Sequence, residues 1–305
     1  MQSTFLVLLC QVKSMTSEAS VKHQIRLMIG SNAGGSGKTT ASAHLAYGLG
    51  KIGYKVTIIE LDYSGSLSSF TGLPMNPIED QSIAKVLKKG FKGDYPLQSV
   101  WSEHLPTVTA IQGGEAIRDC VREVPVNARG HYILQDRLSD YPLAADVVIF
   151  DTPASLEPMG VLALAASTHV LSPIKPEIKD AQGLFGFIRW YDTTLEELRL
   201  TPKPIILGFV PMRVDCLNSG THRDVLGVDK KGEVREGLDL SMTLPGLLDS
   251  LGIHCFPPVK DSKNYLRACT EGLPLSLYRP GIAAAHDFDP IIEQIVQQLK
   301  QGASA

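Results

Sequence analysis

One glycine-rich segment, residues 31–40, carries the residue types best suited to chemistry in this chain, and that chemistry is phosphate binding. The segment reads Ser-Asn-Ala-Gly-Gly-Ser-Gly-Lys-Thr-Thr and lies between a strand-like run and a helix-like run. Glycines let successive backbone N–H groups point inward at phosphate oxygens, which side chains would otherwise block. A helix that begins at Lys38 adds the positive end of its dipole. We therefore expect Lys38 to reach the β- and γ-phosphates and the Thr39 hydroxyl to coordinate Mg²⁺.

The elements that must position this loop are short β-rich runs that alternate with helical stretches from Gln24 onward. The run 146–151 is apolar between its two aspartates, which is typical of a strand buried on both faces. A helix is predicted from the loop to about Leu49, and strands are predicted at residues 25–30, 55–60, 146–151, 169–174, 204–210 and 253–256. This alternation predicts an α/β fold, a single P-loop domain with a mostly parallel twisted sheet and helices on both faces.

The bulk composition limits the classes of protein to consider. The 305 residues are 44% hydrophobic and 20% charged, as in an ordinary globular chain. The net charge of -3 means that contact with nucleic acid would need a local basic patch. Five scattered cysteines without a C-x-x-C pair argue against zinc, iron–sulfur and disulfide frameworks and fit a reducing cytosol. Residues 1–23 are expected to be a disordered leader, with Met15 as an alternative start, and residues 24–305 to form the domain.

The loop departs from the usual G-x-x-x-x-G-K-[ST] pattern, because Asn32 occupies the first glycine position. It resembles the deviant Walker A loop of the ParA/Min-type ATPases, K-G-G-x-G-K-[ST]. The sequence Glu-Leu-Asp-Tyr-Ser-Gly at 60–65 resembles the D-x-D-x-x-G motif of that family, Asp-Thr-Pro at 151–153 closes the Walker B strand, and residues 256–274 resemble the C-terminal segment. The resemblance covers roughly residues 25–299, nearly the whole chain, and implies an ATPase that uses ATP and Mg²⁺.

The resemblance also implies a role for individual positions. Asp62 matches the aspartate that orients the attacking water. Asp151 matches the carboxylate that holds Mg²⁺ through water. Glu60 stands where the family usually has aspartate and is one methylene longer. The expected metal contacts are Thr39, Glu60 and Asp151, and the expected catalytic residues are Lys38 and Asp62. The expected nucleotide contacts are Gly34, Gly35, Ser36, Gly37, Lys38, Thr39, Thr40, Glu177, Arg213 and Pro257. Arg213 and Pro257 are expected to lie beside the adenine.

Ala33 is the departure with the largest consequence. In ParA-type proteins a lysine at this position crosses the dimer interface to the phosphates of the partner, a charge-assisted contact that alanine cannot make. The chain is then a monomeric or degenerate ATPase, an inactive switch, or an enzyme whose partner subunit supplies another lysine. Lys175 and Lys179 are the candidates, with two solvated lysines as the alternative. We prefer Lys179, because Pro176 should place Glu177 and Lys179 on one side of an extended segment.

The subgroup of the family that distributes carboxysomes also lacks this lysine, so the resemblance points to carboxysomes as cargo. It implies a cytoplasmic, nucleoid-associated homodimer that sandwiches ATP and works with a ParB-like or McdB-like adaptor. Lys260, Lys263 and Arg267 stand where relatives bind nonspecific DNA through phosphates. The alternatives are plasmid partition, a metabolic ligase or kinase of the same fold, and electron transfer. A membrane role is not expected, because the helix near residues 291–300 carries one lysine against one glutamate.

Overall fold

Seven strands form one sheet in the computed structural model, which describes residues 23–302 apart from the side chains of residues 178–182. The leader expected at residues 1–23 thus lies outside the described residues, except for His23. The strand order is β3-β4-β2-β5-β1-β6-β7, and every neighbouring pair is parallel except β3 with β4. The prediction of a single α/β domain with a mostly parallel sheet is confirmed. The strands are β1 (Ile25–Ile29), β2 (Val56–Glu60), β3 (Gln98–Ser99), β4 (Val108–Ile111), β5 (Val147–Asp151), β6 (His169–Ile174) and β7 (Ile205–Pro211).

The outer edge beyond β7 differs from the prediction of a last strand at residues 253–256. The segment forms only an isolated bridge between Phe209 and Cys255. Two hydrogen bonds join it to β7, from the Phe209 N–H to the His254 carbonyl at 2.9 Å and from the Phe256 N–H to the Phe209 carbonyl at 2.8 Å. Residues 257 and 258 are prolines without N–H groups, so the ladder cannot continue.

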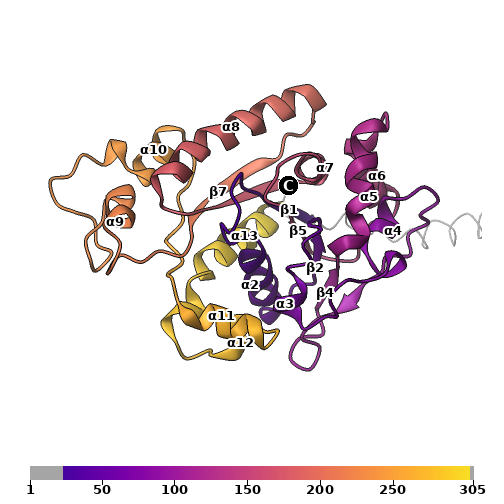
Figure 1. The fold of residues 1–305 in the computed structure, drawn as a ribbon, viewed down its shortest axis with the longest axis horizontal. Coiled ribbons are helices and arrows are strands. Elements are labelled where there is room, and N and C mark those ends of the chain that lie inside the picture. The colour runs from indigo at the N-terminus through magenta and orange to yellow at the C-terminus, as the bar shows by residue number, and fades with distance from the viewer. Residues whose placement is uncertain (1–22, 303–305) are drawn as a thin grey trace, which may run out of the picture.

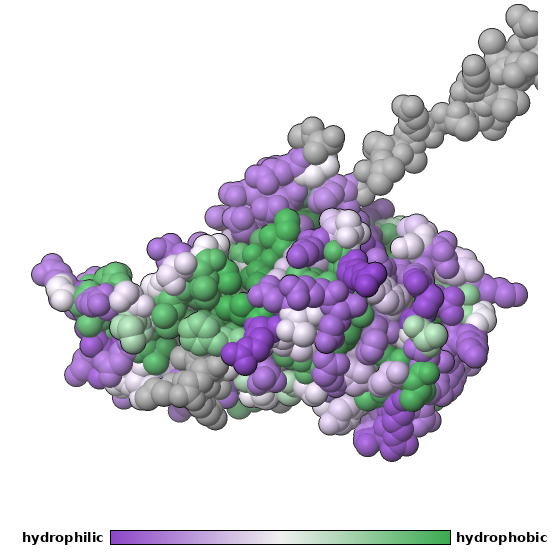
Figure 2. All heavy atoms as spheres, turned by 90° about the horizontal axis from the view of Figure 1, so that it is seen from above, coloured by the Kyte–Doolittle hydropathy of each residue, from purple (hydrophilic) through white to green (hydrophobic). Residues whose placement is uncertain are grey.

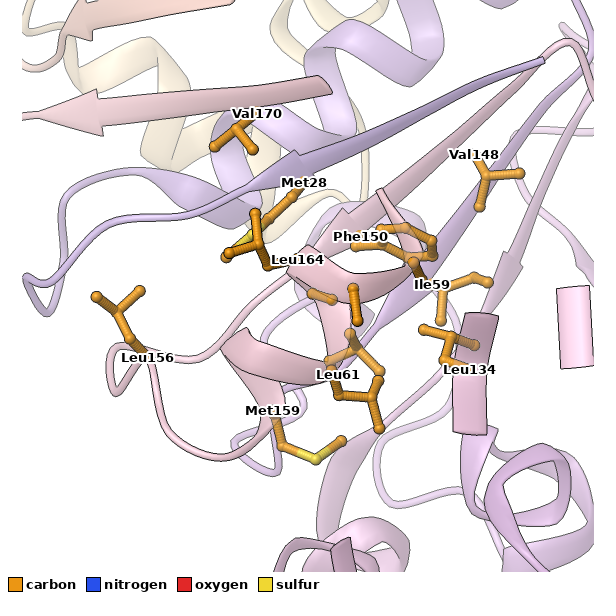
Figure 3. Packing of buried hydrophobic residues seen from close by; sticks show 14 of the residues in the cluster. Met28, Ile59, Leu61, Leu134, Val148, Phe150, Leu156, Met159, Leu164 and Val170 are labelled. Carbon is orange, nitrogen blue, oxygen red and sulfur yellow. The ribbon is translucent and has the colours of Figure 1, made fainter. Parts of the chain in front are cut away.

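Helices cover both faces of the sheet, as Figure 1 shows. Side chains alternate along each strand, so Val148 and Phe150 pack toward the core that includes α4 to α8, whereas Val147 and Ile149 pack toward α2 and α13. Figure 3 shows the first of these cores around Phe150. The helices are α2 (Lys38–Lys51), α3 (Ser68–Thr71), α4 (Ile83–Leu87), α5 (Arg118–Glu123), α6 (Ile133–Asp140), α7 (Met159–Ala166), α8 (Ile178–Leu198), α9 (Gly220–Leu226), α10 (Leu244–Ser250), α11 (Lys263–Thr270), α12 (Leu275–Tyr278) and α13 (Asp289–Gly302).

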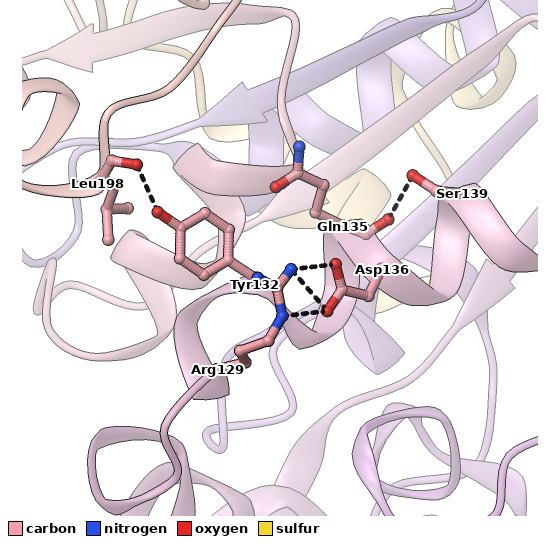
Figure 4. Close-up of polar contacts among 6 residues, drawn as sticks. All are labelled: Arg129, Tyr132, Gln135, Asp136, Ser139 and Leu198. Carbon is pink, nitrogen blue, oxygen red and sulfur yellow. Dashed lines mark hydrogen bonds and ion pairs between the residues drawn. The ribbon is translucent and has the colours of Figure 1, made fainter.

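The region between β4 and β5 is fastened to the end of α8 by a group of polar contacts (Figure 4). Arg129 forms an ion pair with Asp136 at 2.8 Å, and its guanidinium lies 5.0 Å from the centroid of the Tyr132 ring. The Tyr132 hydroxyl donates to the Leu198 carbonyl. The Tyr132 hydrogen bond thus joins the segment just before α6 to the end of α8.

The surface is uneven in polarity. Figure 2 shows apolar side chains gathered toward the left of the face seen from above, with more polar side chains toward the right. Exposed apolar side chains include Phe185 on α8 and Leu217, Val234 and Met242 between β7 and α11. Within residues 23–302, no helix combines the length and the apolar character that crossing a bilayer requires.

His44 joins the helix after the loop to the C-terminal part of the chain. Its Nδ1 donates to the Thr40 carbonyl at 2.7 Å, and its Nε2 accepts from the Leu275 N–H at 2.9 Å. The ring stacks on Phe288 with the centroids 5.0 Å apart. Both ring nitrogens are used as in a neutral imidazole, and burial lowers the pKa of His44 to about 4.

This histidine makes the stability of the protein sensitive to acid. Below pH ~6.5 the unfolded chain takes up a proton on His44 that the folded chain does not accept until about pH 4. The folded pKa is depressed, so this contribution is present above pH ~6.5 and is lost as the pH falls toward 4, by about 3 kcal/mol in the free energy of unfolding. Urea unfolding at pH 7 and at pH 4 measures this change. Between pH 7 and pH 4, the free energy of unfolding should fall less in His44→Gln than in the wild type. The exposed His286 supplies the control His286→Gln, and equal losses in wild type and His44→Gln would contradict the prediction.

Candidate nucleotide-binding site

A cavity of about 640 Å³ lies at the carboxyl edge of the parallel strands. This volume falls within the range of ligand sites, roughly 300–1,000 Å³, and the location is the one where open α/β sheets bind ligands. Its wall is built from segments that follow β1, β2, β5 and β7, together with the start of α11. The lining includes residues 35–40, Asp62, Thr152, Met212, Arg213, residues 259–263, Tyr265, Leu266 and Cys269.

The glycine-rich loop joins β1 to α2, as predicted. Gly37 precedes the first residue of α2 with φ 94°, a conformation that side chains disfavour. A Cβ at this position would lie 2.7 Å from the Met212 Cε, so the flexible end of Met212 would have to shift to make room for a side chain. The Ala41 N–H donates to the Gly37 carbonyl at 2.8 Å and opens the helical hydrogen bonding. The start of α2 therefore faces the cavity with N–H groups suited to an anion.

Lys38 is held inside the concave side of the loop. Its Nζ donates to the Ala33 carbonyl at 3.0 Å and to the Ser31 Oγ at 3.4 Å. The Ser31 Oγ lies 2.6 Å from the Ser36 Oγ, and the Ser36 side chain is fully buried. Burial lowers the pKa of Lys38, while the nearby Asp151 carboxylate acts in the opposite direction. Ser36, a predicted nucleotide contact, thus turns its side chain into the loop and leaves its backbone to face a ligand.

Asp151 and Thr39 form the group of hard oxygen atoms at the bottom of the site. Asp151 is fully buried at the end of β5, and its Oδ1 accepts from the Ser42 Oγ at 3.1 Å. Burial raises the pKa of Asp151 to about 7, while the nearby Thr39 and Ser42 hydroxyls act in the opposite direction. Its Oδ2 has no hydrogen-bond partner among the described residues. A buried oxygen of this kind fits a Mg²⁺ ion or its water shell, because hard cations prefer carboxylate, hydroxyl and water oxygens.

Asp62 and Glu60 lie at the end of β2 in different surroundings. Asp62 lines the cavity, and its Oδ1 accepts from the Ser64 N–H at 2.9 Å. Glu60 has no exposed surface, and its two oxygens accept from the backbone N–H groups of Leu67 at 2.8 Å and Gly113 at 2.9 Å. Burial raises the pKa of Glu60 to about 8, and those two N–H donors act against the increase. The predicted metal contact is therefore a buried carboxylate with both oxygens engaged by backbone.

The two lysines considered as replacements for the missing one are placed differently. The Lys175 Nζ lies 3.6 Å from where a Cβ of Gly35 would stand, so it is directed at the glycine-rich loop of its own chain. Helix α8 begins at Ile178, so the interpretation of the segment around Lys179 as extended is wrong. Glu177, just before the helix, is extended with φ -110° and ψ 150°. Lys179 lies in the first turn of α8, and its side chain lies outside the described residues.

The predicted adenine contacts are partly brought together. Arg213 lines the cavity and its Nε lies 3.6 Å from the Asp261 Oδ1. Pro257 is exposed and does not line the cavity; the chain instead contributes the segment that begins at Val259. Glu177 lines a second, polar cavity of about 450 Å³ that shares Arg213 and Asp261 with the first. Backbone hydrogen bonds join residues 211–214 to residues 259–261, which explains why the side chains of Arg213 and Asp261 meet.

Two of the three residues predicted to bind DNA line the same cavity. Lys260 and Lys263 are exposed and line it, and Arg267 is exposed one turn further along α11. Met212 and Leu266 are further lining residues that the sequence analysis did not identify. Neither methionine nor leucine is specific to nucleotide binding, so the residue types gave no indication. The sequence offered only their positions, Met212 directly after β7 and Leu266 inside the C-terminal segment.

The chain is similar to several known proteins in sequence and in fold. Residues 25–201 match the AAA_31 family, described as an AAA domain. A candidate replication protein A of Rhizobium rhizogenes is 30% identical over 177 residues, or 54% of this chain and 43% of that protein, so the chain spans less than half of this relative. The maintenance of carboxysome distribution protein A of Synechococcus elongatus is 26% identical over 72% of this chain and 83% of that protein. The structure of apo McdA from Cyanothece has a TM-score of 0.73 at 20% identity, over 90% of this chain and 100% of McdA, so the two share a fold.

Proposed function

The chain belongs to the AAA_31 family of ParA/MinD-type P-loop ATPases, and from this premise we propose that it hydrolyses ATP to position a cargo on the nucleoid. The observation that carries the proposal is the convergence of four side chains, of which Lys38, Thr39 and Asp62 line the cavity and Asp151 is buried close to them. Lys38 and Thr39 come from the start of α2, directly after the glycine-rich loop, Asp62 comes from the end of β2 and Asp151 from the end of β5. Together these residues supply one cation, one hydroxyl and two carboxylates, a combination that suits phosphoryl transfer to water.

Each of these groups has a part in the proposed hydrolysis. The N–H groups of residues 34–37 and the Lys38 amine hold the phosphates, and Thr40 adds its backbone at the start of α2. Thr39 and the free oxygen of Asp151 would hold Mg²⁺, which neutralises phosphate charge when bound. Asp62 orients the attacking water and accepts its proton. Arg213 and the segment that begins at Val259 line the cavity and would lie against the base and ribose of a bound nucleotide.

We place the second lysine of the site at Lys175 and propose that, in a homodimer that sandwiches two nucleotides, it contacts the phosphates held by the loop of its own chain. Support comes from the direction of its Nζ toward Gly35 and from the cavity that it lines with Glu177. The preference for Lys179 loses its geometric basis, because α8 begins at Ile178. Lys175 thus stands in for the cation that Ala33 cannot provide.

The proposal also includes binding to DNA and to a cargo. Lys260, Lys263 and Arg267 form an exposed cationic group, which suits contact with DNA phosphates without sequence preference. The cargo is proposed to be carboxysomes, supported by Ala33 and by the likeness to the Synechococcus protein. A McdB-like or ParB-like adaptor on the cargo would stimulate hydrolysis and release. The protein is then cytoplasmic and nucleoid-associated.

The proposal is tested by gel filtration and DNA mobility shift with the Asp62→Ala variant, which should hold ATP. With ATP and Mg²⁺ the variant should elute as a dimer and shift DNA of arbitrary sequence, and with ADP it should do neither. Adding Arg267→Ala should weaken binding equally on all sequences and reduce the slope of log K against log salt by about 1 for each phosphate that the protein no longer neutralises. Arg267 is chosen because it does not line the cavity.

Lys92→Ala is the matched control, since Lys92 is an exposed cation that precedes β3 and does not line the cavity. It should leave both the affinity and the salt slope unchanged. A protein that stays monomeric with ATP and does not bind DNA would refute positioning on the nucleoid and favour a metabolic enzyme of this fold.

A further inference from the structure

Glu60 is the buried carboxylate at the end of β2 that the proposed hydrolysis does not use. It has no exposed surface, and its two oxygens accept hydrogen bonds from two different loops. The Leu67 N–H, 2.8 Å from Oε1, belongs to the loop that follows β2. The Gly113 N–H, 2.9 Å from Oε2, belongs to the turn that follows β4. One side chain therefore ties together two loops that are 46 residues apart in the sequence, as the numbers of these two donors give.

Both loops hold Asp62. The loop that ends at Leu67 carries Asp62 itself, and the Ser64 N–H in this loop donates to the Asp62 Oδ1 at 2.9 Å. On the other side, the Gly114 N–H donates to the Asp62 carbonyl at 3.0 Å. A Cβ at Gly113 would stand 2.7 Å from the carbonyl oxygens of both Asp62 and Glu60, so the turn lies directly against the backbone of this motif. Moving either loop would move Asp62.

The length of the Glu60 side chain matters for this arrangement. Asp151 is the register partner of Glu60 on the neighbouring strand, and it keeps an oxygen free of hydrogen bonds among the described residues. Glu60 keeps no such oxygen, because each one already accepts a backbone N–H. An aspartate at this position would be one methylene shorter and would leave at least one of these buried donors unpaired, which costs free energy. Asp151 can therefore offer a metal ion an oxygen that accepts no hydrogen bond from the described residues, and Glu60 cannot.

We propose that Glu60 is a positioning residue, which fastens the loop of Asp62 to the turn at residues 113–114 and so sets the place of the Asp62 carboxylate, rather than a member of the metal shell. The inference rests on the proposed role of Asp62 in hydrolysis. It replaces the predicted metal contact of Glu60 with a role that acts through another residue. The physical reason is that a general base must be placed to within about 1 Å, since larger errors can cost on the order of 10²-fold in rate.

The experiment compares Glu60→Gln and Glu60→Asp with the wild type. Both variants should lower kcat by on the order of 10- to 100-fold, while the KM for ATP and the Mg²⁺ concentration for half-maximal activity stay within about twofold. Asp146→Asn is the matched control. Asp146 is also a buried carboxylate that accepts a backbone N–H, from Lys55 at 2.8 Å, but at the opposite edge of the sheet. It should lower the melting temperature without lowering kcat.

A double variant separates the inference from the proposed function. In single-turnover assays, adding Glu60→Gln to Asp62→Ala should not reduce the residual rate further, because the residue that Glu60 positions is already gone. A higher Mg²⁺ requirement in Glu60→Gln, or full activity in Glu60→Asp, would overturn the inference and restore Glu60 to the metal shell. Normal kcat in Glu60→Gln together with an inactive Asp62→Ala would refute the inference alone. Normal hydrolysis in Asp62→Ala would refute both the role of Asp62 and the inference built on it.

Discussion

Asp62→Ala is expected to reduce ATP hydrolysis by on the order of 10²- to 10⁴-fold, the range of general acid–base catalysis, and to leave ATP binding intact. Asp62 lines the cavity beside the loop of Lys38 but makes no hydrogen bond to that loop among the contacts of the described residues. Removing it takes away the acceptor for the proton of the attacking water and removes little that holds the nucleotide. The measurement is steady-state phosphate release together with binding of a fluorescent ATP analogue.

Asp119→Ala serves as the control, because Asp119 is a highly exposed aspartate on α5 that does not line the cavity. Its hydrolysis rate should equal that of the wild type. Asp62→Asn extends the test, since it keeps the shape and an acceptor oxygen for the Ser64 N–H but cannot take up a proton. Loss of analogue binding in Asp62→Ala would instead mean that this loop builds the site, and retention of hydrolysis in Asp62→Asn would refute the role as a base.

Lys175→Ala is expected to weaken ATP-dependent dimerisation by roughly 10- to 100-fold, the effect of losing one hydrogen bond to a charged group. The reason is that phosphates brought together in a closed site need cations from the protein. Adding Ala33→Lys to this variant restores a cation in the loop itself, at the position where related proteins carry it, and should recover most of the dimer. Analytical ultracentrifugation with a nonhydrolysable ATP analogue measures both changes.

Lys203→Ala is the matched control for charge, because Lys203 is exposed in the segment before β7, at the opposite end of that strand from the site. It should dimerise as the wild type does. Lys179→Ala is measured alongside. If it abolishes the dimer while Lys175→Ala does not, the proposed assignment of the cation to Lys175 is wrong. If neither variant changes the dimer, no lysine of this segment replaces the missing one.

Much of the scaffold could be predicted from local pattern. The apolar runs that became β1, β2, β5, β6 and β7 are long enough to identify without neighbours, and their predicted bounds differ from the observed ones by one residue or less. The strands β3 and β4 were missed, because they have only two and four residues. Strands this short are stabilised by pairing with a neighbouring strand, and their own residues do not favour a strand strongly enough to predict one.

Residues 31–40 determine the conformation and the chemistry of the phosphate-binding loop by themselves, because glycine torsion angles and a helix start depend on adjacent residues. Which side chains complete the site was decided by packing across long distances in the chain. Met212 closes on Gly37, Lys175 approaches Gly35, and residues 259–263 form the opposite wall. The motif predicted a metal contact for Glu60, and only the tertiary structure shows that the N–H groups of Gly113 and Leu67 engage its carboxylate. No local pattern encodes such contacts, since they arise only when separate strands end at one edge of the sheet.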